Sequence, residues 1–184
     1  MSSAVLARAA AFCERFGLRA PILLAPMAGA CPAALSIAVA NAGGMGGAGL
    51  LLDGPDAIAA WMRALRAGTA GPVQLNLWVP DPPPARDADH ERRVREFLAG
   101  FGPAVAPVAG DARPPDFAAQ CQAVLAAAPA AVSSIMGLFP AAFVAELKAR
   151  GVAWFAVATT VAEAVAAEAA GADVIVAQGA EAGG

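Results

Sequence analysis

The sequence predicts an α/β fold in which helices flank a parallel β-sheet. Short apolar runs begin at residues 21, 45, 72, 131, 152 and 173. Such continuous runs, bounded by glycine and proline, are typical of parallel strands that are buried on both faces. The alanine-rich stretches between most of them have the length of a crossover helix. The residues by themselves leave two architectures open, an open doubly wound sheet and a barrel that is cut short.

The first part of the chain alternates regularly between helix and strand. Helices are predicted over residues 4–16, 33–42 and 54–68, and strands over residues 21–26, 45–51 and 72–78. Gly17 supplies the left-handed residue that commonly follows a helix. Asp53 is expected to cap the third helix with its carboxylate. Each strand, with the helix after it, therefore forms one β/α unit.

An irregular excursion interrupts this alternation at about residues 80–128. It contains the charged run 86–96 and the only histidine, His90. Within it we expect helices at about 91–98 and 116–127. The pattern then resumes, with strands predicted over residues 131–136, 152–157 and 173–178 and helices over residues 140–150 and 160–170. Thr160 and Glu163 have the spacing of a capping box at the start of the last helix.

Composition excludes several classes of protein. Hydrophobic residues make up 59% of the chain and charged residues 15%, and the formal net charge is −3. Intrinsic disorder requires few apolar groups, and a general nucleic-acid binder requires a basic surface, so both are excluded. The uncharged windows 20–52 and 117–145 are long enough to span a membrane, but prolines and glycines break them into short runs. We therefore expect no membrane-spanning segment.

The cysteines are few and far apart, at Cys13, Cys31 and Cys121. An odd number at these spacings fits neither a disulfide framework nor a metal site, so buried thiols in a reducing compartment are the simpler interpretation. No signal peptide is visible, and we expect a cytoplasmic protein. His90 stands in a charged stretch and is predicted to be solvated rather than catalytic.

Familiar catalytic motifs are missing from the sequence. Gly44, Gly46 and Gly49 match the G-x-G-x-x-G pattern of dinucleotide-binding folds. In those folds the pattern lies between a strand and a helix, whereas here it lies between a helix and a strand. Close packing of the two elements explains these glycines better.

Two neutral amides mark the carboxyl ends of predicted strands, where parallel α/β folds carry their chemistry. Asn76 is the lone amide near the end of one apolar strand, and Gln178 ends another. An amide offers two donors and an acceptor to the edge of a polar ring. Beyond Gln178, Gly183 and Gly184 would let backbone N–H groups approach an anion. These features predict a flat, polar-edged, anionic cofactor, and the alternative for Asn76 is a core amide bonded to neighbouring backbone.

Several of these segments resemble the nitronate monooxygenase family, also called 2-nitropropane dioxygenases. The resembling segments are Ala25-Pro-Met-Ala-Gly29, Gln74-Leu-Asn-Leu-Trp-Val-Pro80, Ala158-Thr-Thr160 and Gly171–Gly184. The last segment is specific to the family, whereas Ala-Pro-Met occurs more widely among FMN barrels. The similarity runs from about Pro21 to the last residue.

The resemblance implies a TIM-type (β/α)8 barrel with non-covalently bound FMN. Asn76 and Gln178 would contact the edge of the isoalloxazine ring, Gly183 would lie against the cofactor, and backbone around Met27 would line the pocket. The implied reaction is oxidation of alkyl nitronates, such as propionate 3-nitronate, by O₂. A carbonyl compound and nitrite or nitrate are the products. No metal is implied.

The family pattern continues beyond the glycine pair into a histidine that assists with the nitronate, and this sequence ends at Gly184. The catalytic residue is therefore unknown. We expect residues 1–184 to form one incomplete FMN-binding barrel domain of about six β/α units. Such an arc leaves two sheet edges and apolar faces uncovered. We expect it to bind FMN weakly and to show little activity alone.

Three alternatives remain open on the sequence. An FMN-dependent enoyl-acyl carrier protein reductase has the same fold and similar strand-end motifs. The chain could instead be a non-catalytic half-barrel that closes its edges in a homodimer or with a second polypeptide. It could also be a fragment without a cellular role.

Overall fold

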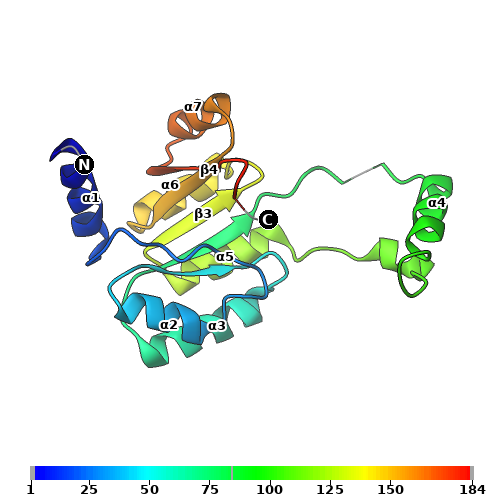
Figure 1. The fold of residues 1–184 in the computed structure, drawn as a ribbon, viewed down its shortest axis with the longest axis horizontal. Helices are drawn as coiled ribbons and strands as arrows, with labels where there is room; N and C mark the ends of the chain where they lie inside the picture. The colour runs from blue at the N-terminus through cyan, green and yellow to red at the C-terminus, as the bar shows by residue number, and fades with distance from the viewer. Residues whose placement is uncertain (1–2, 84, 183–184) are drawn as a thin grey trace. The chain divides into compact units, whose positions relative to one another are not determined.

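The computed structural model describes residues 3–83 and 85–182 (Figure 1). Two compact units make up this part of the chain. The larger unit contains the segments on either side of the excursion, up to Pro80 and from Pro115 onward, and the smaller unit is Asp81–Pro114.

The larger unit is a five-stranded parallel sheet with its strands in chain order. The strands are β1 (Gly46–Gly49), β2 (Val73–Trp78), β3 (Ala131–Ile135), β4 (Ala153–Ala158) and β5 (Val174–Ala177). A doubly wound sheet reverses its strand order at a switch point, whereas the strands of a (β/α)8 barrel follow one another. The sequential order therefore identifies the wall of a barrel and excludes the doubly wound alternative.

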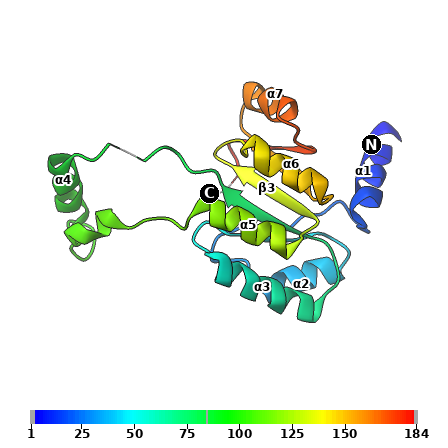
Figure 2. The ribbon, with the colours of Figure 1, turned by 180° about the vertical axis from the view of Figure 1, so that it is seen from behind.

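Helices cover one face of this sheet. They are α2 (Ala33–Asn41), α3 (Pro55–Gly68), α5 (Phe117–Ala127), α6 (Ala141–Ala149) and α7 (Val161–Ala169). Figure 2 shows α5 and α6 in front of the strands when the molecule is seen from behind. The side chains beneath them form the main core, which includes Leu50, Leu65, Leu75, Leu77, Val132, Leu147 and Trp154, all 0% exposed.

Of the side-chain caps predicted at the starts of helices, one is confirmed and one is wrong. Thr160 accepts a hydrogen bond from the backbone N–H of Glu163, whose carboxylate accepts one from the N–H of Thr160, so the predicted capping box is confirmed. The prediction that Asp53 caps α3 is wrong. Gly54 occupies the cap position, without a side-chain hydrogen bond, and Pro55 begins the helix. Among the described residues, no helix combines the length and apolar character needed to cross a membrane.

The predicted strand 21–26 is reduced to a single parallel bridge between Leu23 and Met45. Leu24 donates its N–H to the carbonyl of Met45, and Met45 donates its own to the carbonyl of Ile22. The next bond of this ladder would need an N–H at Pro26, which proline does not have. The prediction of a full strand is therefore wrong, because Pro26 lacks the N–H that would continue the ladder.

Ser36 binds the backbone groups of Gly47, whose carbonyl would otherwise face the missing N–H of Pro26. Its hydroxyl donates to the carbonyl of Gly47 at 2.8 Å and accepts from the N–H of Gly47 at 3.1 Å. Ser36 is itself 0% exposed. One side chain of α2 thus satisfies both backbone groups at this point of β1.

We predict that Ser36→Ala lowers the free energy of unfolding by about 1–3 kcal/mol, because two buried backbone groups lose their partner. Chemical denaturation measures the change. Ala34→Ser on the exposed part of the same helix is the control and is expected to change stability little. Equal stabilities of the Ser36→Ala variant and the unaltered chain would contradict this account of β1.

The opposite, inward face of the sheet carries a second apolar cluster. It consists of Leu18, Met45, Ala131, Ala153 and Phe155. Helix α1 (Ser3–Phe16) covers this cluster with Phe12 and Phe16, and the ring of Phe16 meets that of Phe155 edge-on at 5.2 Å between centroids. Since Ala131 and Ala153 begin their strands, α1 closes the amino-terminal end of the inward face.

Asp173 joins three elements at this amino-terminal end. Its carboxylate accepts hydrogen bonds from Arg15 of α1 at 2.8 Å, from Lys148 of α6 at 2.6 Å and from the backbone N–H of Trp154 at 2.9 Å. Partial burial opposes ionisation, but these hydrogen bonds outweigh it and hold the pKa of Asp173 below its usual range. The charged carboxylate therefore stabilises the folded chain.

We predict that Asp173→Asn destabilises the chain by about 2 kcal/mol at neutral pH, because charge-assisted hydrogen bonds are lost. The lowered pKa means that the stabilisation is complete above the unfolded pKa of about 4 and is lost as pH falls through the folded value. The stability gap between the two proteins should therefore close in acid. Denaturation at a series of pH values tests this.

Asp111→Asn is the control, since that carboxylate is ion-paired to Arg86 but 63% exposed. It should change stability by less than about 1 kcal/mol. If the stability difference between Asp173→Asn and the unaltered chain stayed constant down to strongly acidic pH, the charge of Asp173 would not be the source of the stabilisation.

The smaller unit consists of α4 (Ala88–Leu98) and a 3₁₀ turn, Pro107–Asp111. Asp87 caps α4 by accepting from the N–H groups of Asp89 and His90. None of the residues in these two elements is buried, and His90 is exposed. Helix α5, by contrast, packs against α3 in the larger unit through residues such as Val124 and Leu125. The compact excursion is thus Asp81–Pro114, a shorter segment than residues 80–128.

Candidate functional site

The alternation of side chains along β2 places Asn76 on the inward face. Leu75 and Leu77 belong to the core beneath the helices, so Gln74, Asn76 and Trp78 point the other way. Gln74 and Asn76 are almost completely buried, at 5% and 4% exposure, whereas Trp78 is 41% exposed. Polar and aromatic side chains therefore share the inner surface of this strand.

Gln178 follows β5 on the same face. Val174 packs against the inward cluster, and Gln178 continues the alternation because its N–H donates to the carbonyl of Ala158 at 2.9 Å. The register pairs Asn76 with Ser133, Ser133 with Phe155 and Phe155 with Val174. Val174 is therefore level with Asn76 across the sheet. Gln178 follows four residues later and lies about 13 Å further along the strand, at roughly 3.3 Å per residue.

The two amides therefore share a face of the sheet, but they do not contact each other. The structure brings Gln178 nearer to the carboxyl-terminal rim than Asn76. The third predicted residue of this group, Gly183, lies outside the described residues. Gln178 itself is half-buried. In the loop after it, the N–H of Ala182 donates to the carbonyl of Gly179 at 3.1 Å and closes a turn.

Asn76 is only partly satisfied by the protein. Its side-chain nitrogen donates to the hydroxyl of Ser133 at 3.0 Å and to the carbonyl of Ser133 at 3.3 Å. Within the described residues, its side-chain oxygen accepts no hydrogen bond and is not sealed from solvent. Backbone and hydroxyl contacts thus fix the amide, while its acceptor remains available to a ligand.

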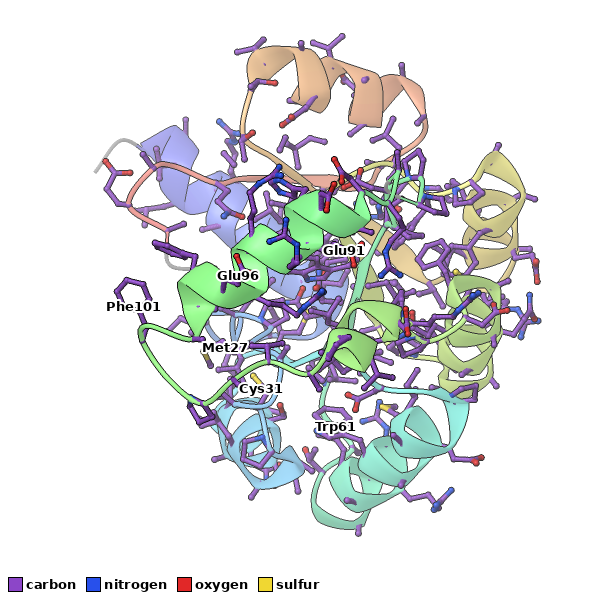
Figure 3. The ribbon with its side chains drawn as sticks, turned by 90° about the vertical axis from the view of Figure 1, so that its right-hand side faces the viewer. Met27, Cys31, Trp61, Glu91, Glu96 and Phe101 are labelled. Carbon is purple, nitrogen blue, oxygen red and sulfur yellow. The ribbon has the colours of Figure 1, made fainter. Side chains whose placement is uncertain are left out.

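Met27 lies in a loop that follows the first apolar run and packs against β1. Its side chain is 41% exposed, and its backbone N–H is bonded to the sulfur of Cys31 at 3.4 Å (Figure 3). A Cβ atom at Gly49 would come within 2.8 Å of the nitrogen of Ala28. Only glycine at position 49 allows the loop to lie this close to the strand.

The backbone N–H groups next to Met27 remain open. Ala28 and Gly29 are exposed, and their N–H groups make no hydrogen bond within the part of the chain that the structure describes. Gly29 has φ +72°, a conformation that favours glycine. The loop therefore offers backbone donors rather than a charged side chain.

Exposed apolar side chains accompany these polar groups at the carboxyl ends of the strands. They are Met27, Trp78, Met136 and Val176, which are 41%, 41%, 57% and 37% exposed. A mixture of apolar surface and a few positioned polar groups is typical of sites for small molecules. Two surface hollows lie elsewhere, one at the amino-terminal end beside Asp173 and the other between α3 and α5. Neither is lined by Asn76, Gln178 or Met27.

The described residues hold no cluster of histidine, cysteine or carboxylate side chains that could bind a metal ion. The predicted site residues are likewise uncharged. The residues Met27, Asn76 and Gln178 therefore offer side-chain amides, backbone donors and apolar surface rather than charge.

Sequence reasoning missed Met136, the residue after β3. It adopts φ +69° although it is not glycine, and a bulky residue in this region is strained. Nothing in the sequence signals such a conformation, because it depends on how β3 turns into the following loop. Strained residues of this kind cluster at functional sites.

A parallel sheet with its strands in chain order and helices over its outer face defines part of a (β/α)8 barrel. A family model described as "Nitronate monooxygenase" matches residues 11–184. The chain belongs to the nitronate monooxygenase family.

Curated relatives agree with this assignment. The chain is 39% identical over 174 residues to the nitronate monooxygenase of Paraburkholderia phytofirmans, with 91% of this chain and 47% of the relative covered. It is 37% identical over 187 residues to that of Pseudomonas aeruginosa, with 94% and 51% covered. The chain thus spans about half the length of the curated relatives it matches.

Solved structures confirm the partial barrel. A nitroalkane oxidase from Streptomyces ansochromogenes matches with a TM-score of 0.80 and 32% identity, over 95% of this chain and 50% of that one. A mutant of FabK from Thermotoga maritima matches with a TM-score of 0.70 and 25% identity, over 95% and 47%.

We predict that Met136→Gly raises the free energy of unfolding by about 1 kcal/mol, because glycine relieves the left-handed strain and the lost side chain is mostly exposed. Ala128→Gly should act in the same direction, since Ala128 has φ +46° at the end of α5. Leu138→Gly, at an exposed position without positive φ, should destabilise. Thermal and chemical denaturation separate these outcomes, and destabilisation by Met136→Gly would show that its side chain contributes to packing.

Proposed function

We propose that this chain forms the flavin-facing wall of an FMN-dependent enzyme that oxidises alkyl nitronates, such as propionate 3-nitronate, with O₂. The observation that carries the proposal is the partly free amide of Asn76. It lies on the same inward face as Gln178, in a chain that belongs to the nitronate monooxygenase family. When bound, the flavin would take electrons from the nitronate and pass them to O₂, and the products are a carbonyl compound with nitrite or nitrate.

The residues present fit the polar edge of an isoalloxazine ring. Asn76 is held by Ser133 and keeps a free acceptor, which suits a ring N–H. Gln178 supplies a second amide closer to the rim, and the N–H groups of Ala28 and Gly29 are free donors. Trp78 and Met136 add exposed apolar surface for the flat face of the ring.

These residues supply amides, backbone donors and apolar surface, and none of them is charged. A nitronate is already the deprotonated form of a nitroalkane, so its oxidation needs no base to remove a proton from carbon. The amides and backbone donors of this chain would orient the cofactor. We assign none of them a catalytic role.

The enoyl-acyl carrier protein reductase alternative has less support. The chain shares 25% identity and a TM-score of 0.70 with the FabK mutant, against 32% and 0.80 with the nitroalkane oxidase. The family model and the curated relatives also bear the nitronate monooxygenase name. We therefore favour nitronate over an enoyl thioester as the substrate class.

We predict that the chain binds FMN saturably and that Asn76→Ala weakens binding about tenfold, as expected for one lost hydrogen bond near the upper end of the usual range. Asn41→Ala is the matched control, because Asn41 is an exposed amide of α2 bonded to the carbonyl of Gly68. It should leave the affinity unchanged. Titration followed by flavin fluorescence measures both variants.

The reaction class is tested separately with FMN-loaded protein. Because we expect little activity of this chain alone, propionate 3-nitronate should produce only slow O₂ uptake and nitrite, whereas NADH with an enoyl thioester should produce no reduction. Failure of the folded chain to bind FMN would overturn the proposal. Reduction of the thioester without any reaction of the nitronate would replace it with the reductase function.

A further inference from the structure

We propose that Cys31 is a positioning residue whose thiol holds the Ala25–Cys31 loop in the shape that presents the backbone around Met27. The inference rests on the proposed function in one respect, that this backbone faces a flavin. It assigns no chemical step to the thiol.

The thiol of Cys31 bonds to the loop on both sides of Pro26. It accepts from the N–H of Met27 at 3.4 Å and donates to the carbonyl of Ala25 at 3.4 Å. Cys31 is 7% exposed, so water cannot readily replace these contacts. One side chain therefore closes the loop onto its own first residues, where proline itself supplies no N–H.

The rest of the scaffold fixes Cys31 and the base of the loop. Trp61 of α3 donates its indole N–H to the carbonyl of Cys31 at 2.9 Å, and Gln74 of β2 donates its amide to the carbonyl of Leu24 at 3.0 Å. Gly49 of β1 lets the loop approach within contact distance. Figure 3 shows Met27, Cys31 and Trp61 together in this region.

This arrangement leaves the exposed tip with a single internal hydrogen bond, from the N–H of Ala30 to the carbonyl of Met27 at 3.1 Å. The N–H groups of Ala28 and Gly29 point to no protein acceptor among the described residues. Their positions therefore depend on the thiol that fixes Met27. Loss of the thiol would free the N–H of Met27 and let the tip change its shape.

The variants Cys31→Ala and Cys31→Ser separate this role from simple packing. Serine keeps a donor and an acceptor, although its C–O bond is shorter than the C–S bond of cysteine, whereas alanine keeps neither group. Cys121→Ala is the matched control, because Cys121 is another buried thiol, 6% exposed, on α5. Denaturation shows how much stability each variant loses.

The first measurement needs no flavin. Amide hydrogen exchange at Met27 should become at least about tenfold faster in Cys31→Ala, be partly restored in Cys31→Ser and remain unchanged in Cys121→Ala. Unchanged exchange at Met27 in Cys31→Ala would overturn the proposal.

The second measurement is FMN affinity. Cys31→Ala should bind FMN about fivefold to tenfold more weakly, with partial recovery in Cys31→Ser, while Cys121→Ala keeps the original affinity. Equal affinities would overturn the role toward the flavin. If the unaltered chain binds no FMN, the proposed function fails, and the exchange result alone decides whether Cys31 holds the loop.

Discussion

The parallel register of β2, β3 and β4 determines both the core and the candidate site. Side chains alternate across a strand, so a shift of one residue between neighbours would exchange the inward and outward faces. In the observed register Leu75 and Leu77 lie beneath the helices, and Asn76 faces inward beside Ser133. The amide is held in place by the same ladder that buries the leucines. The chemistry of the inward face is therefore a consequence of how the core packs.

The two ends of the barrel wall have different properties. At the amino-terminal end, α1 seals the inward face and Asp173 binds Arg15, Lys148 and the backbone of β4. At the carboxyl-terminal end, the predicted site residues are neutral and several apolar side chains are exposed. Barrel folds generally place stabilising contacts at the first end and ligand contacts at the second. The proposed site of this chain follows that division.

Much of the fold was predictable because it depends on local patterns. Apolar runs indicated the strands, and Asn76 and Gln178 stood out as lone amides at strand ends. The first strand was predicted wrongly, because the effect of Pro26 depends on which backbone groups of β1 lie opposite it. The loop contacts of Cys31 with Trp61 were likewise hidden, since the two residues are 30 positions apart. No pattern in a single sequence encodes such a pairing.

The two borders of the sheet are chemically unequal. On the β1 side, the flanking segment carries Pro21 and Pro26, and Ser36 occupies the groups of Gly47 that would otherwise pair with a neighbour. Strand β5 contains no proline, and within the described residues no strand pairs with it on the side away from β4. Strand addition is therefore less hindered beyond β5 than at the proline-bearing border. A wall of this kind grows most easily in the order in which the polypeptide is synthesised.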